Sequence, residues 1–246
     1  MARNALGFER EKPTGEGTAP LRLVIFDVDG TLVDSQNHIV EAQHCAFAAL
    51  GLPPPSRRET LAVVGLSLPE AFAALVGAEG PVLALSEAYK EAWTVLRGRA
   101  DFAEVLYPGA RETIAALAAD PEVLLGIATG KSRKGVDRLL AAQGWEGQFA
   151  TLHTADEHPS KPDPSMIVTA LRETGVPADA AVMVGDTTFD MEMARAAGIR
   201  AIGVAWGYHE PSALTHCGAE CVAADFSALR TILKPATSKV APAPAS

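Results

Sequence analysis

Two aspartates at the end of one apolar segment, Asp27 and Asp29, are the residues of this sequence best placed to do chemistry. The segment Arg22–Phe26 is typical of a buried strand, so both acids lie at its carboxyl end. Side chains alternate along an extended chain, and the two carboxylates therefore share one side while Val28 points away. Crowded carboxylates are costly to bury unless a cation or a proton compensates them. The pair predicts a site for Mg²⁺ and an oxyanion substrate.

Two simpler interpretations compete with this one. A strand that ends in Asp-Gly is often an ordinary turn, made easy here by Gly30. The pattern also resembles the start of an EF-hand calcium loop, but the spacing excludes it. The sixth loop position would be Leu32 instead of glycine, and the twelfth would be His38 instead of glutamate.

Two further polar motifs follow apolar segments later in the chain. Thr129 and Gly130 precede an expected helix, whose free N–H groups can bind an anion, although Thr129 or Ser132 could serve only as a helix cap. Lys161 lies in the sequence Ser-Lys-Pro-Asp-Pro, where two prolines restrict the loop and Asp163 could cap the next helix. This lysine is either held towards the carboxylates or is a solvated surface residue.

Asp186 and Asp190 form the last motif, Gly-Asp-x-x-x-Asp, after an apolar strand. Asp186 would lie at the strand end and Asp190 in the first turn of the following helix. Helix capping is the alternative explanation for both.

Apolar strand-like segments alternate with amphipathic ones through most of the chain. Expected strands are Arg22–Phe26, 123–128, 150–153, Ala181–Gly185 and 200–205, and expected helices are 110–119, 132–143, 164–174 and 189–197. This alternation predicts an α/β fold, a Rossmann-like three-layer core with a parallel sheet covered on both faces. Ligands of such sheets bind beyond the carboxyl ends of the strands.

Residues 36–106 break the alternation. Apolar spacing of three and four over 39–50, 69–76 and 83–97 predicts an inserted all-helical cap domain above the strand ends. The core then comprises 21–35 and 107–233. Residues 1–20 and 234–246 lack apolar periodicity, which predicts a flexible arm and a disordered tail.

The ordered motifs Asp-x-Asp, Thr, Lys and Gly-Asp-x-x-x-Asp resemble those of the haloacid dehalogenase-like hydrolase superfamily across residues 22–205. The helical insert, with Asp34-Ser35 before it, is similar to the cap of the phosphoglycolate phosphatase-like branch. The resemblance implies a phosphatase in which Asp27 attacks phosphorus and forms an aspartyl-phosphate. Asp29 would protonate the leaving alcohol and then activate water.

The same resemblance implies the remaining site residues. Asp27, the backbone carbonyl of Asp29, and Asp186 would hold Mg²⁺, with Asp190 assisting directly or through water. The phosphoryl oxygens would be held by Thr129, the Gly130 N–H and Lys161.

The resemblance leaves the substrate open between phosphoglycolate and a sugar phosphate. The expected cap loop over 65–68 makes Leu66 and Ser67 candidates for substrate choice, while the cap cations Arg57, Arg58, Lys90, Arg97 and Arg99 are expected to be solvated. A sugar-phosphate phosphomutase is an alternative, because Lys131, Arg133 and Lys134 could form a second phosphate subsite or only a solvated helix start. Less favoured are a phosphonate hydrolase, in which Lys90 would form a Schiff base, and a non-catalytic binding protein.

The length, charge and cysteine content of the chain disfavour several other classes of protein. The chain has 246 residues, 48% of them hydrophobic, and a net charge of −9, which disfavour a disordered chain and a nucleic-acid-binding role. No apolar run is long enough to span a membrane and no signal-peptide pattern begins the sequence. Three cysteines, two of them near His216, are too few for a zinc set or a disulfide framework. We therefore expect a cytoplasmic monomer or homodimer whose partner is a small phosphorylated metabolite.

Overall fold

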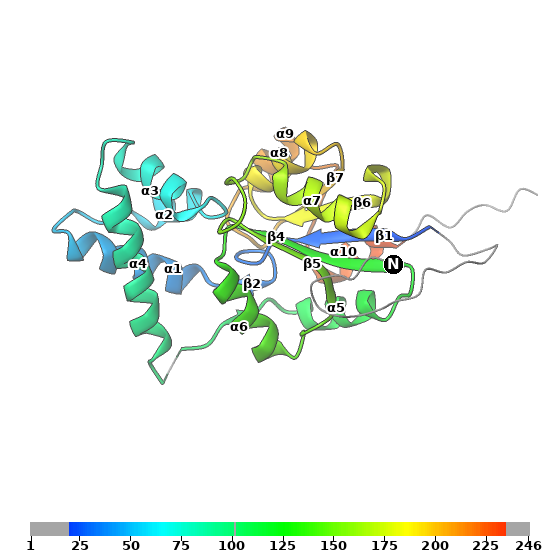
Figure 1. Ribbon diagram of the computed structural model, residues 1–246, viewed down its shortest axis with the longest axis horizontal. Helices are drawn as coiled ribbons and strands as arrows, with labels where there is room; N and C mark the ends of the chain where they lie inside the picture. Colours follow the sequence, from blue (N-terminus) through cyan, green and yellow to red (C-terminus); the bar gives the residue numbers. More distant parts are fainter. Residues whose placement is uncertain (1–19, 101, 235–246) are drawn as a thin grey trace, which may run out of the picture.

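The computed structural model describes residues 20–100 and 102–234, and Figure 1 shows a helix-covered sheet lying beside a separate group of helices. Six parallel strands form the sheet. In spatial order they are β5 (Phe149–Thr154), β4 (Val123–Thr129), β1 (Arg22–Phe26), β6 (Ala181–Gly185), β7 (Arg200–Val204) and β8 (Cys221–Ala223). Strand β1, which Asp27 follows directly, is therefore central, with two strands on one side and three on the other.

Helices cover both faces of this sheet. They are α5 (Ala110–Ala118), α6 (Arg133–Gln143), α7 (Ser165–Thr174), α8 (Thr188–Ala196), α9 (Pro211–His216) and α10 (Phe226–Leu233), with a short 3₁₀ turn at Ala178–Ala180. Along β1, Val24 and Phe26 pack with α5, α6 and α10, whereas Leu23 and Ile25 pack with α7, α8 and α9. Alternate side chains of this one strand thus pack into two hydrophobic cores, one on each face of the sheet. The predicted three-layer α/β fold is confirmed.

Some elements were not predicted from the sequence. The strand expected at 150–153 extends by one residue at each end, and α9, β8 and α10 follow the last predicted strand. These segments are six, three and eight residues long, too short for a clear periodic pattern. The predicted arm and tail fall almost entirely in 1–19 and 235–246, outside the described residues.

Four helices follow the first strand, where the cap was expected: α1 (Gln36–Ala49), α2 (Arg57–Ala62), α3 (Leu68–Val76) and α4 (Val82–Arg97). Helix α1 packs along α4, and residues of α1, α3 and α4 form two apolar clusters apart from those of the sheet. The chain enters and leaves this group through β2 (Val33–Asp34) and β3 (Val105–Leu106), which pair antiparallel. None of the described helices is both long and apolar enough to cross a membrane.

We expect Phe72→Ala to destabilise the helical insert. Phe72 is completely buried, and its ring lies 6.2 Å from that of Phe47 and 5.9 Å from that of Tyr89. Removing a buried phenyl ring costs about 3–5 kcal/mol through lost burial and the cavity left behind. Urea denaturation measures the loss, with Leu83→Ala, at a residue that is 76% exposed, as a control expected to change little.

Candidate active site

Three buried aspartates converge at the carboxyl end of the sheet. Asp27 follows β1, Asp186 follows β6 and Asp190 lies on α8, and one carboxylate oxygen of each is within 4.8 Å of the others. All three are at most 1% exposed. Adjacent parallel strands bring the first two together, because β1 pairs with β6 and both end at this edge.

One buried ammonium lies in this cluster. Lys161 is 1% exposed, and its Nζ lies 2.9 Å from Asp27 Oδ1 and 2.6 Å from Asp190 Oδ1. Lys161 lies in the loop that follows Thr154, the last residue of β5, and leads to α7, where Asp163 accepts a hydrogen bond from the Ser165 N–H. The structure thus brings Lys161 to the acids, and the solvated alternative is wrong for it.

Asp190 is held by the start of its own helix. Its Oδ2 accepts from the Thr187 N–H at 3.0 Å and from Thr187 Oγ1 at 2.7 Å, which forms a capping box at the first turn of α8. Its Oδ1 accepts from Lys161. Helix capping was therefore a correct alternative, but the same carboxylate also belongs to the acid cluster.

Asp186 is fixed by two residues that were not among the predicted site residues. Thr31 Oγ1 donates to its Oδ1 at 2.8 Å, and the Tyr208 N–H donates to its Oδ2 at 2.9 Å. Gly30, with φ +89°, brings the chain so close that an added Cβ would lie 2.2 Å from Asp186 Oδ2. A side chain at position 30 would therefore clash with the carboxylate, whatever its backbone strain.

The acid cluster suits a divalent cation. Burial raises the pKa of Asp27 to about 6, against the opposing effect of Lys161, and burial together with Asp27 and Asp190 raises the pKa of Asp186 well above its usual range. Asp27 Oδ1 is ion-paired with Lys161, whereas Oδ2 has no hydrogen-bond partner among the described residues, so the lone pairs of Oδ2 remain available. Oxygen donors of this kind are the ligands that Mg²⁺ prefers.

Asp29 is held differently from Asp27. Its Oδ1 accepts from Ser35 Oγ at 2.7 Å and from Lys131 Nζ at 3.0 Å, and Ser35 Oγ also lies 3.0 Å from the hydroxyl of Tyr208. The Asp29 side chain is 15% exposed. This carboxylate therefore has a fixed orientation but remains in contact with the space above the sheet.

Lys131 corrects an expectation from the sequence. Its side chain is only 10% exposed, with Nζ 3.0 Å from both Asp29 Oδ1 and Glu104 Oε1 and 5.5 Å from the centre of the Trp93 ring. Neither a solvated helix start nor a free phosphate subsite describes it. Burial opposes its charge, but the two carboxylates outweigh that effect and raise the pKa of Lys131.

The other anion-binding candidates, Thr129 and Gly130, lie where β4 meets the insert. Thr129 is 1% exposed and is the last residue of β4, at the same sheet edge as Asp27. A Cβ added at Gly130 would lie 2.7 Å from the carbonyl oxygens of Gly65 and Leu66, so only glycine allows this close approach. Ser132, and not Thr129, caps α6 by accepting from the Gly135 N–H.

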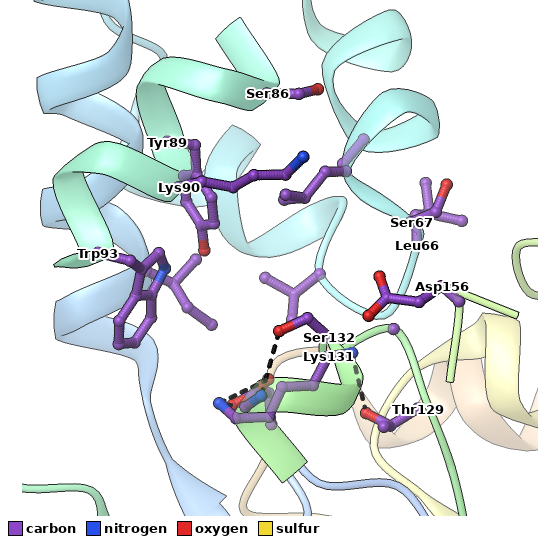
Figure 2. Close-up of a pocket in the computed structure, with 18 of the residues that line it drawn as sticks. Leu66, Ser67, Ser86, Tyr89, Lys90, Trp93, Thr129, Lys131, Ser132 and Asp156 are labelled. Carbon is purple, nitrogen blue, oxygen red and sulfur yellow. Dashed lines mark hydrogen bonds and ion pairs between the residues drawn. The ribbon is translucent and has the colours of Figure 1, made fainter. Parts of the chain in front are cut away.

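A cavity of about 650 Å³ separates the sheet edge from the insert. Asp27, Asp29, Thr129 and Lys131 line it from the core, and Figure 2 shows Tyr89, Lys90 and Trp93 of α4 facing Thr129 and Lys131 across it. The cap-loop residues Leu66 and Ser67 also line it, and the Ser67 N–H donates to Ser160 Oγ at 2.8 Å. The loop that carries Lys161 therefore also holds the cap loop.

This arrangement agrees with comparisons to known proteins. Residues 24–204 match the haloacid dehalogenase-like hydrolase family. The chain is 36% identical to the probable phosphatase IndB of Dickeya dadantii (strain 3937), over 89% of this chain and 97% of that protein. It is 31% identical to a phosphoglycolate phosphatase of Agrobacterium fabrum, over 86% and 91% of the two chains.

Solved structures have the same fold. A predicted phosphoglycolate phosphatase from Haemophilus somnus superposes with a TM-score of 0.76, covering 89% of this chain and all of that one, at 23% identity. A hydrolase from Pseudomonas syringae gives 0.75 at 26% identity, over 85% and 96% of the chains. The chain therefore belongs to the haloacid dehalogenase-like hydrolase family. The resemblance stated from its motifs is confirmed, and so is the prediction that the protein is an enzyme of this family, a hydrolase of phosphate esters.

We expect Mg²⁺ to stabilise the protein through the acid cluster. In the metal-free protein the raised pKa of Asp27 contributes stability below pH 4 that is lost as pH rises through about 6, because the ionised form is then buried and Lys161 offsets only part of the cost. Added Mg²⁺ should raise the thermal midpoint at pH 7.5, and by less at pH 5, where protons compete. Differential scanning calorimetry measures both.

The matched controls are Asp186→Asn and Asp179→Asn. The first removes a buried member of the cluster and should eliminate the stabilisation, whereas the second changes an exposed acid elsewhere. Equal stabilisation of the two variants by Mg²⁺ would place the cation outside the cluster.

Proposed function

We propose that this protein is a Mg²⁺-dependent phosphatase that hydrolyses a small phosphomonoester through an aspartyl-phosphate on Asp27. The observation that carries the proposal is the buried Asp27 carboxylate beside the cavity, whose Oδ1 lies 2.9 Å from Lys161 Nζ and whose Oδ2 has no hydrogen-bond partner among the described residues. A nucleophile needs such a free lone pair. The relatives named as phosphatases support the same reaction.

The residues around Asp27 would bind the metal ion and the phosphoryl oxygens. Asp27, Asp186 and the Asp29 carbonyl would hold Mg²⁺, with Asp190 assisting, and the bound cation would offset the charge of the phosphate. Lys161 would attract the phosphoryl oxygens while it orients Asp27 and Asp190. Thr129 and the Gly130 N–H would bind the same oxygens from β4.

Asp29 would serve as the general acid and then as the base. Its side chain lines the cavity, whereas Ser35 and Lys131 fix its orientation. A carboxyl group in that place can protonate the leaving alcohol and afterwards take a proton from the attacking water.

Two rivals lose support from the geometry. A phosphomutase needs a second phosphate subsite, to which Lys131, Arg133 and Lys134 could have contributed. Lys131 is ion-paired with two acids and Arg133 pairs with Asp137 at 3.0 Å, which leaves only Lys134 of the three beside the cavity without an ion pair among the described residues. Lys90, the Schiff-base candidate of a phosphonate hydrolase, pairs with Glu87 at 2.7 Å and its side chain is 58% exposed. A Schiff-base lysine has to be desolvated and neutral.

For the substrate we propose phosphoglycolate or a sugar phosphate. The relatives' names support the first, whereas the cavity of about 650 Å³ and its lining by Leu66, Tyr89 and Trp93 leave room for a leaving group larger than glycolate. A panel of phosphomonoesters, read by phosphate release with Mg²⁺, ranks them. The cytoplasmic location and the monomeric or homodimeric state stay predictions.

Asp29→Asn should separate the two half-reactions. An aryl phosphate with a good leaving group needs no acid for the first step, so the variant should release one burst of phenol per site and then stall. Stopped-flow absorbance follows the burst. In the Asp27→Asn control both burst and turnover should vanish, a loss of at least about 10³-fold or 4 kcal/mol. Steady turnover by Asp29→Asn at the wild-type rate would contradict the role of Asp29.

Substitutions in the cap loop should alter substrate choice. Leu66 and Ser67 line the cavity from the insert, whereas the acid cluster lies on the core. Leu66→Arg should therefore change the ranking of substrates without changing the Mg²⁺ requirement. The specificity constants of a phosphate panel measure this, and the aryl phosphate should be affected least. If all esters slowed by one factor, the cap loop would be only a cover.

A further inference from the structure

A second group of possible ligands lies outside the active site. His153 on β5 and the following residues Glu157 and His158 each present one ligand atom, and these atoms lie within 4.8 Å of one another. Strand β5 is at the edge of the sheet, with β4 between it and the nucleophile strand β1. His153 is buried, His158 is half-buried and Glu157 is exposed, so the group opens to solvent.

The surroundings of His153 fix which of its nitrogens carries a proton. Its Nε2 lies 3.1 Å from Glu173 Oε2, and Thr151, on the same side of β5, donates to that oxygen at 2.7 Å. An ionised carboxylate can only accept, so Nε2 is the protonated nitrogen and Nδ1 keeps a free lone pair.

His158 faces that lone pair. Its Nε2 lies 3.0 Å from His153 Nδ1, and its Nδ1 lies 2.8 Å from Ser165 Oγ. Without a metal, one proton on His158 Nε2 joins the two rings. Both histidines therefore have their outer nitrogens held by hydrogen bonds and their inner nitrogens directed at each other, an arrangement that orients metal ligands.

We propose that His153 Nδ1, His158 Nε2 and the Glu157 carboxylate bind a Zn²⁺ ion. Two imidazole nitrogens and one carboxylate suit Zn²⁺, with water as a fourth ligand, whereas Mg²⁺ prefers oxygen donors. On binding, the proton of His158 moves from Nε2 to Nδ1, and the Ser165 hydroxyl changes from donor to acceptor. Both rings stay neutral, so no proton is lost from the pair.

The ion would tie the turn at 154–158 to the sheet edge. This turn leads directly to Ser160, which accepts from the cap-loop Ser67 N–H, and to Lys161 of the acid cluster. Zn²⁺ would therefore stabilise the loop that joins the catalytic lysine to the cap, without belonging to the catalytic centre.

Isothermal titration of Zn²⁺ into protein saturated with Mg²⁺ tests the proposal, because Mg²⁺ then occupies the acid cluster. We expect one Zn²⁺ per chain, and binding at least ten-fold weaker in His158→Gln and in Glu157→Gln. Glu173→Gln removes the charge of one outer partner of His153, whose Nε2 also lies 2.8 Å from Thr151 Oγ1, and should weaken binding by about 10-fold. Co²⁺ in place of Zn²⁺ should show the visible bands of a four-coordinate site, and His158→Gln should lose them.

Two controls separate this site from other metal binding. His216→Gln removes an exposed histidine near Cys217, and Asp27→Asn disturbs the acid cluster, and neither should change Zn²⁺ affinity. Circular dichroism of each variant without zinc checks that it folds. The proposal is overturned if Mg²⁺-saturated protein takes up no Zn²⁺, or if His158→Gln binds it as tightly as the wild type. The first result would leave the group as a hydrogen-bond network only.

Discussion

The structure depends on the crowding of three buried carboxylates around a single buried ammonium. Asp27, Asp186 and Asp190 carry more negative charge than Lys161 can balance, and an unbalanced buried charge is strongly unfavourable. The fold tolerates it because Asp190 is also a helix cap and Asp186 accepts from Thr31 and from the chain after β7. The remaining excess of negative charge is what a divalent cation would neutralise.

The same sheet edge connects the core to the helical insert. Lys131 joins Asp29 to Glu104, which lies just before β3, and its ammonium lies over the Trp93 ring of α4. The backbone of the cap loop rests on Gly130, and Ser160 holds that loop one residue before Lys161. The residues that would perform the chemistry and the residues that would select the substrate therefore share contacts. A displaced insert would change the environment of Asp29 as well as the cavity.

Much of this could be predicted from the sequence, because strand ends and motif order are local signals. The place of Asp27 after an apolar strand, and of Asp186 after another, follows from alternation and from the parallel sheet. The contacts of Lys131 could not be predicted in the same way. The contact with Asp29 joins residues 102 positions apart along the chain, and those with Glu104 and Trp93 depend on how the insert packs. Tyr208 belongs to no motif that the sequence shows, although it lies shortly after the end of β7, where its N–H donates to Asp186. The paired histidines at 153 and 158 depend on Glu173 from α7, which no local pattern connects to them.

The most direct measurement of the central claim is the chemical identification of the phosphorylated residue. Asp29→Asn protein, mixed with an aryl phosphate and Mg²⁺ and quenched in acid, should contain one added phosphoryl group on the peptide that includes Asp27. Borohydride reduces an acyl phosphate to an alcohol with loss of phosphate and leaves free carboxylates unchanged, so tandem mass spectrometry of a reduced sample should find homoserine at position 27. The account predicts a stoichiometric adduct at Asp27. Release of phenol without any adduct, or an adduct on another residue, would contradict it.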